Sequence, residues 1–271
     1  MIRVLVAGAR TLVQDLGRPG LSHLGLSRGG AADPAALRRA NAYAGNPPGA
    51  AALEVLLGGL EVQALAPVVV GVAGADCGVA PVTALAAGQR LRLGTPVRGL
   101  LTYLAVAGGI DTPVVLGSRA RHELGGVGPA ALRPGEVLPV GRLRTWVDPL
   151  LLGPRLELPA SVVVCRLHPG PREPSVEALC RSSWTVSGRV DRTAARLDGP
   201  ALPRRTTEAE PEGLVLGAVQ LPPDGRPIVM LADHPVTGGY PVVAVVHADD
   251  VRLVAQSRPG TTVRFVPATR Q

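Results

Sequence analysis

Two polar segments carry most of the side chains in this chain that could do chemistry. The first is Val13–Gly20, in which Gln14, Asp15 and Arg18 stand among two glycines and a proline. Loops of this composition serve a tight turn or a binding site. Arg18 could hold a carboxylate or phosphate through two N–H groups. It could equally pair with Asp15 and fasten the loop, and the sequence leaves both readings open.

The second polar segment, Leu231–Pro241, begins as an apolar strand and continues into Asp233, His234, Thr237, Gly238, Gly239 and Tyr240. Asp233 could orient or deprotonate a substrate group, and Thr237 and Tyr240 could donate hydrogen bonds to it. Paired glycines let a backbone approach a ligand or another chain closely. The alternative is a barrel corner whose turn needs two glycines and whose tyrosine fills a gap.

Other polar residues favour structural roles. His23 could act as a general base, but a lone histidine is more often an ordinary hydrogen-bonding group. Asp191 and Arg192 predict a structural ion pair, with Arg196 nearby. The signatures His-Glu-x-x-His and Gly-x-Ser-x-Gly, and the Rossmann glycine fingerprint, do not occur. The sequence therefore does not indicate a complete, self-sufficient active site, and it predicts no metal site.

The composition excludes several function classes. The net charge is +7, yet every basic residue is arginine, and these arginines are scattered. Aromatic residues make up only 2%, so few side chains are available to stack on bases. We therefore expect no nucleic-acid partner. Without lysine there is no Schiff base and no Walker-type phosphate loop.

Three widely spaced cysteines form neither a disulfide framework nor a zinc pattern, which favours a reducing, cytoplasmic location. No signal peptide is evident at the N-terminus. The longest apolar run, Ala64–Ala75, is interrupted by Pro67 and Gly71 and is too short to span a bilayer. We therefore expect no membrane partner.

The elements that must position these residues are predicted to be mainly strands. Short Val/Leu runs alternate with 34 glycines and 27 prolines, which favours a mainly β architecture with a few short helices. Asp33-Pro34 predicts a helix start and Gly45 its end, and a second helix is expected over 249–256. We expect an N-terminal β-rich domain over 1–155 and a C-terminal β-barrel domain over 156–271, with a linker near 144–159.

A series of motifs in order along almost the whole chain resembles one family. It opens with Val13–Gly20 and His23-Leu24-Gly25 and closes with Asp233 and Thr237–Pro241. Between them come Ala52-Leu53-Glu54, Gly74-Ala75-Asp76, Tyr103–Ile110, Leu116–Arg119, Asp191-Arg192 and Gly217–Pro222. Together they resemble the biotin-dependent carboxyltransferase family, also called allophanate hydrolase subunit 2 or KipA-like.

The resemblance implies two cyclophilin-like β-barrel domains and a role inside a complex. The partners it implies are a KipI-like subunit (allophanate hydrolase subunit 1) and a third hydrolase subunit. The implied reaction is ATP-dependent opening of 5-oxoproline to L-glutamate, a small-molecule amide hydrolysis, with ATP and Mg in the complex. Biotin, where it is used, would be attached to another chain.

The resemblance also suggests roles for residues of this chain. Asp233, Thr237 and Tyr240 are the expected catalytic residues. Substrate binding is expected from Gln14, Asp15, Arg18, His23, Gln220, Gly238 and Gly239. In this reading Arg18, Gln220 and the N–H groups of the two glycines stabilise developing negative charge. We expect the two polar segments to line one cleft or the partner interface.

Two other functions fit the same resemblance: carboxyl transfer to urea-like amides, and non-enzymatic capture of a KipI-like kinase inhibitor. The chain also departs from the family pattern. Ala194 stands where glycine is common, Val242 stands where lysine is common, and the region 121–134 is shortened. If that lysine touches a charged substrate, its loss removes the contact; if it faces solvent, nothing follows.

Overall fold

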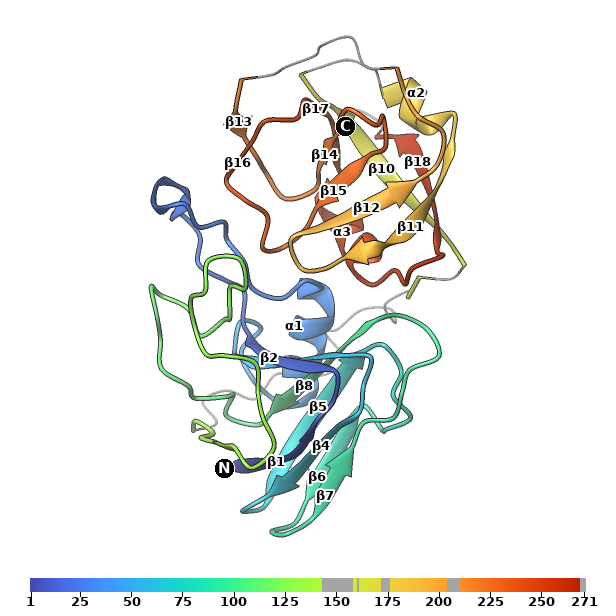
Figure 1. Cartoon of the computed structure of the whole chain (residues 1–271). Helices are drawn as coiled ribbons and strands as arrows, with labels where there is room; N and C mark the ends of the chain where they lie inside the picture. Colours follow the sequence, from blue (N-terminus) through green and yellow to red (C-terminus); the bar gives the residue numbers. More distant parts are fainter. Residues whose placement is uncertain (143–157, 160, 172–175, 204–209, 269–271) are drawn as a thin grey trace. The chain divides into compact units, whose positions relative to one another are not determined.

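The computed structural model describes residues 1–142, 158–159, 161–171, 176–203 and 210–268 (Figure 1). The chain divides into two compact units. The first unit comprises residues 1–18 and 29–158, and the second comprises 19–28 and 159–271. The predicted linker near 144–159 lies almost entirely outside the described residues.

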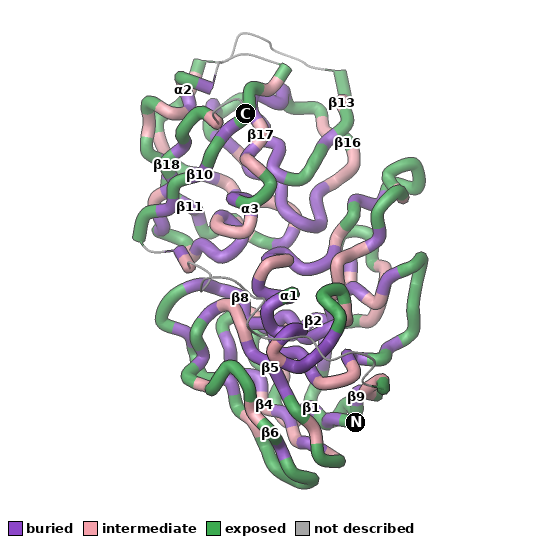
Figure 2. Tube along the Cα trace, turned by 180° about the vertical axis from the view of Figure 1, so that it is seen from behind, coloured by how far each residue is buried: buried purple, intermediate pink, exposed green. Residues whose placement is uncertain are grey.

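The described strands of the first unit form two sheets. The four-stranded sheet has the order β7-β4-β1-β9, from Arg90–Arg92, Leu60–Ala64, Ile2–Ala7 and Val137–Leu138. The five-stranded sheet has the order β2-β3-β8-β5-β6, from Arg10–Gln14, Ala52–Leu56, Leu101–Val106, Val68–Gly74 and Val82–Leu85. Strand β8 is buried along its whole length (Figure 2). Apolar residues of both sheets share one buried cluster.

The helix that the sequence predicts after Asp33 is α1 (Pro34–Tyr43), and it packs against the five-stranded sheet. The Asp33 side chain accepts a hydrogen bond from the N–H of Ala36, and Pro34 occupies the first helical turn. A Cβ atom on Gly71 of β5 would collide with the carbonyl oxygen of Ala40. The helix can therefore rest on β5 because that position has no side chain.

The second unit contains a closed barrel of seven strands. Their order is β10-β17-β14-β15-β12-β11-β18, from Val162–Pro169, Val242–Val246, Ala218–Gln220, Ile228–Met230, Ala194–Asp198, Ser183–Val190 and Thr262–Pro267. The first and last of these strands, β10 and β18, pair in parallel and close the barrel, and the other pairs are antiparallel.

Smaller elements complete the second unit. They are a two-stranded sheet of β13 (Glu212–Gly213) and β16 (Thr237–Gly238), the helices α2 (Val176–Cys180) and α3 (Ala248–Ala255), and the 3₁₀ turn η1 (Ser22–Leu24). The His247 side chain caps α3 by accepting from the N–H of Asp249. No helix within the described ranges has both the length and the apolar character needed to cross a membrane.

The prediction of a mainly β protein with a few short helices is confirmed. The closed barrel lies in the second unit, whereas the described strands of the first unit are arranged in two separate sheets.

Candidate functional site

In the first unit, Asp15 fastens the polar loop to the segment 118–119. Its Oδ1 accepts from the N–H of Gly17 at 2.8 Å and from the Ser118 hydroxyl at 2.6 Å, and its Oδ2 accepts from the N–H of Arg119 at 2.7 Å. A Cβ on Gly30 would lie 2.9 Å from the Asp15 carbonyl oxygen, so the chain passes very close here. With three donors around one carboxylate, Asp15 shapes this loop.

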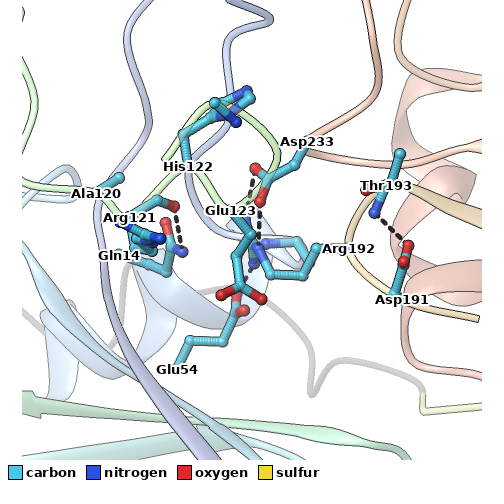
Figure 3. A network of polar contacts seen from close by, with 12 residues as sticks. Gln14, Glu54, Ala120, Arg121, His122, Glu123, Asp191, Arg192, Thr193 and Asp233 are labelled. Carbon is cyan, nitrogen blue, oxygen red and sulfur yellow. Dashed lines mark hydrogen bonds and ion pairs between the residues drawn. The ribbon is translucent and has the colours of Figure 1, made fainter. Parts of the chain in front are cut away.

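Arg18 and Gln14 are both buried and both reach the same neighbouring segment. The Arg18 guanidinium donates to the carbonyl of Ala120 at 2.6 Å and to that of Val115 at 3.4 Å. The Gln14 amide donates to the carbonyl of Arg121 at 2.8 Å, and Figure 3 shows the two groups facing each other. The structure thus brings Gln14, Asp15 and Arg18 together along residues 115–121.

Sequence reasoning did not find a second polar network in the first unit. Glu54 Oε2 accepts from the Tyr103 hydroxyl at 2.6 Å and from the N–H of Ala32 at 2.9 Å, while the Tyr103 oxygen accepts from the N–H of Asp33 at 2.8 Å. Complete burial, with the nearby Glu54 and Asp33 charges, raises the pKa of Tyr103 well above its ordinary value. The phenol therefore stays protonated and anchors the start of α1.

In the second unit, Asp233 forms a buried ion pair with Arg192. Arg192 Nε lies 2.9 Å from Oδ2 and Nη2 lies 3.1 Å from Oδ1, and the two side chains are 3% and 0% exposed (Figure 3). The N–H of Asp233 also donates to the carbonyl of Arg192 at 2.9 Å. This two-pronged geometry fixes the position of the carboxylate.

The predicted structural pairing of Asp191 with Arg192 takes a different form. Asp191 Oδ1 accepts from the N–H groups of Thr193 and Ala194, at 2.7 and 3.1 Å, and so closes the turn after β11. Arg192 is thereby turned to Asp233, and Arg196 pairs with Asp224. The Arg192–Asp233 contact joins residues distant in sequence, which explains why local spacing could not reveal it.

The corner between β16 and β17 gathers several of the predicted residues. Buried Gln220 donates to the carbonyl of Tyr240 at 2.9 Å. A Cβ on Gly238 would lie 2.5 Å from the Gln220 amide nitrogen, whereas a Cβ on Gly239 would meet nothing within 4 Å. Thr237 is exposed on β16, and Tyr240 is 42% exposed.

Three further positions bear on the predicted site. His234 is buried, its Nδ1 lies 2.8 Å from the Pro235 carbonyl, and burial lowers its pKa from the ordinary value. Val242, at the position where the resemblance led us to expect lysine, is buried in an apolar cluster, and its N–H donates to Glu212. His23 is exposed on η1. That the two polar segments share one cleft stays a prediction.

The described residues form two units, of which the second contains a closed seven-stranded barrel. Each unit has a buried polar network at its loops. This architecture defines a mainly β protein of two subdomains. The family model "Carboxyltransferase domain, subdomain A and B" matches residues 24–267, and the chain belongs to this family.

Relatives agree with this assignment. The chain is 38% identical to a 5-oxoprolinase subunit of Escherichia coli, with 98% of this chain and 91% of the relative covered. It is 32% identical to the corresponding 5-oxoprolinase subunit of Haemophilus influenzae, with 100% and 92% covered. It is 30% identical to urea amidolyase of Lachancea kluyveri, covering 97% of this chain and 17% of the relative.

Among solved structures, TTHA0988 is 36% identical with a TM-score of 0.87; the match covers 98% of this chain and 55% of that one. The chain therefore spans about half the length of TTHA0988. Urea amidolyase of K. lactis is 28% identical with a TM-score of 0.89, covering 99% of this chain and 19% of that one.

Proposed function

We propose that this chain is one subunit of an ATP-dependent amidohydrolase that opens 5-oxoproline to L-glutamate. The observation that carries the proposal is the 38% identity to a 5-oxoprolinase subunit of Escherichia coli over nearly the full length of both chains. The proposed complex also contains a KipI-like subunit and a third hydrolase subunit, and it uses ATP with Mg. A cytoplasmic location fits such an assembly.

The chemistry explains why ATP is needed. A lactam carbonyl resists attack by water, and transfer of the γ-phosphoryl group to its oxygen makes the carbon a better electrophile. In the net reaction, two water molecules are consumed, one for the lactam C–N bond and one for the terminal phosphoanhydride bond. The products are L-glutamate, ADP and phosphate. The protein must orient the lactam and supply donors where negative charge develops.

In the second unit, Thr237 and Tyr240 are exposed, whereas Asp233 and Gln220 are buried and already hydrogen-bonded within the protein. We assign to Asp233, held by Arg192, the orientation of the substrate amide, and to Thr237 and Tyr240 hydrogen bonds to it. Both are exposed, which leaves their hydroxyl groups accessible. Gln220 and the N–H groups of Gly238 and Gly239 are the assigned donors to the substrate oxygen. In the first unit, the assignment of Gln14, Asp15 and Arg18 to substrate binding is indirect, because they shape the loop at 115–121.

Reconstitution tests this proposal. The purified chain is combined with the partner subunits, and glutamate release is measured with and without ATP. We expect release that requires ATP and every subunit. Asp233→Asn should abolish turnover while the complex still assembles, and the matched control Asp224→Asn, on the exposed pair with Arg196, should retain it. Absence of turnover in every combination would contradict the proposal, and assembly without turnover would favour the capture of a KipI-like inhibitor.

Carboxyl transfer to a urea-like amide is the second candidate, and a specific observation favours it. The chain matches a carboxyltransferase family model and urea amidolyase relatives over almost its whole length. The carboxyl group would come from carboxybiotin on another protein, because this chain has no lysine to carry biotin. Consumption of urea that depends on carboxybiotin, without glutamate release from 5-oxoproline, would favour this function over the first.

A further inference from the structure

A pocket of about 920 Å³ lies within the first unit. Its volume falls in the range of small-molecule sites. The lining comes from the loop after α1, the loop after β8, the segment after Val140 and the side chain of Arg119. None of its residues was expected to bind a ligand from the sequence.

Two glycine amides that line this pocket are bonded within the protein. A Cβ on Gly108 would collide with the carbonyl oxygen of Gly141, so these two loops touch through their glycines. The N–H of Gly108 donates to Asn46 Oδ1 at 2.7 Å, and the N–H of Gly141 donates to the carbonyl of Gly109 at 3.0 Å. These two amides are therefore not available to a ligand, and the charged side chains of the pocket are the groups best suited to recognise one.

Three charged side chains line the pocket: Arg119, Arg142 and Asp111. Arg119 forms an ion pair with Asp111, and the two side chains are 31% and 50% exposed, so water reaches the pair. Arg142 is exposed, and within the described residues no ion pair engages it. Two guanidinium groups against one carboxylate leave the pocket with a positive excess.

We propose that this pocket binds a small molecule through its carboxylate, held by Arg119 and Arg142 in competition with Asp111. Arg119 already holds a carboxylate at this place, and a guanidinium matches a planar carboxylate through parallel N–H bonds. An incoming carboxylate displaces Asp111 from Arg119, and Arg142 supplies the second positive charge. The choice of ligand rests on the proposed function, because 5-oxoproline and L-glutamate both carry a carboxylate.

Binding to the full-length chain without its partners tests the site. Isothermal titration calorimetry compares 5-oxoproline and L-glutamate with 2-pyrrolidinone, which has the lactam ring but no carboxylate. We expect the two acids to bind and the neutral lactam to bind at least about tenfold more weakly, since a charge-assisted pair is lost. Equal binding of 5-oxoproline and 2-pyrrolidinone, or no binding of either acid, would overturn the proposal.

Two variants with opposite expected effects make the test specific. Arg119→Met should weaken binding of the acids about tenfold, because one charge-assisted pair is removed. Asp111→Asn should strengthen binding because the internal competitor is removed. The matched control Arg92→Met, on exposed β7 outside the pocket, should leave binding unchanged. If Asp111→Asn weakens binding or leaves it unchanged, the competition is refuted.

The binding experiments test the pocket independently of the proposed function. Turnover by the reconstituted complex, with no binding to the chain alone, overturns the pocket and leaves the proposed function standing. Binding to the chain alone that follows the expected order of variants, with no turnover by any complex, supports the pocket and counts against the proposed function.

Discussion

At the scale of single residues, Arg192 and Asp233 form a charge pair whose side chains are only 3% and 0% exposed. The pair places a carboxylate at the end of a barrel strand and fixes its orientation through two N–H groups. Charges inside a protein are tolerated when each has its partner, and removing one partner leaves the other uncompensated. We therefore expect Arg192 to act on the proposed site through Asp233.

Replacing Arg192 should destabilise the folded protein strongly. We expect Arg192→Met to lower the free energy of unfolding by about 3–5 kcal/mol, because the buried Asp233 charge loses its guanidinium partner. Urea unfolding measures this change. Arg192→Met combined with Asp233→Leu should cost less than the sum of the single variants. Arg196→Met, on a more exposed pair, should cost about 1 kcal/mol or less. Similar costs for the two arginines would contradict the buried-pair interpretation.

His234 makes stability depend on pH at the same loop. Burial lowers its pKa in the folded state, so the unfolded chain binds a proton first as the pH falls. The contribution of neutral His234 is fully present above the ordinary histidine pKa of about 6.5. It is lost progressively as the pH falls below that value toward the lowered folded pKa. His234→Gln should therefore flatten the dependence of unfolding free energy on pH between about 7 and 5. An unchanged slope in His234→Gln would show that another group titrates.

At the scale of elements, the corner between β16 and β17 depends on close approach. β16 pairs with β13, and the register places Gly238 opposite Glu212. Gln220 on β14 fills the space beside Gly238 and holds the carbonyl of Tyr240. This segment can therefore form a barrel corner and still bind a ligand. Gly238 is needed for packing against Gln220, whereas the space beside Gly239 is open.

Adjacent glycines allow a matched comparison. Gly238→Ala should push the Gln220 amide and the end of Leu214 aside, break the bond to Tyr240, and cost about 1 kcal/mol of stability. Gly239→Ala should change stability by less than about 0.5 kcal/mol, because nothing lies near its Cβ. Thermal unfolding of the two variants measures the difference. Equal losses of stability in the two variants would mean that the position of the Gln220 side chain does not require glycine at 238.

The helices and strands that could be predicted from the sequence are those marked by residues close together in the chain. α1 follows from Asp33 and Pro34, and strands such as β8 follow from continuous apolar runs. The short strands β13 and β16 escaped notice because two residues carry no periodicity, and their pairing depends on distant chain. The Glu54–Tyr103 bond and the Arg192–Asp233 pair were missed for the same reason. Its residue type made Asp233 a candidate in the sequence, but its pairing with Arg192 could be seen only in the fold.

At the scale of the whole molecule, each unit builds its own core. The first unit buries one apolar cluster drawn from both of its sheets. In the second unit, closure depends on the parallel pairing of β10 with β18, which lie at opposite ends of the barrel sequence. We expect this pairing to form late in folding, because a long loop must be ordered before the contacts repay its entropy. We therefore expect the barrel to be most vulnerable at its closing strand, β18.

Phe265 tests that vulnerability, since it lies on β18 opposite Cys165 and is 2% exposed. Phe265→Ala should destabilise the barrel by about 3–5 kcal/mol through lost burial and a cavity. Hydrogen exchange followed by mass spectrometry should show faster exchange in β10, β11 and β18, while β8 of the first unit stays protected. The neighbouring Arg264→Ala, on the exposed side of the same strand, should leave both regions unchanged. Equal loss of protection in β8 would show that the two cores unfold as one.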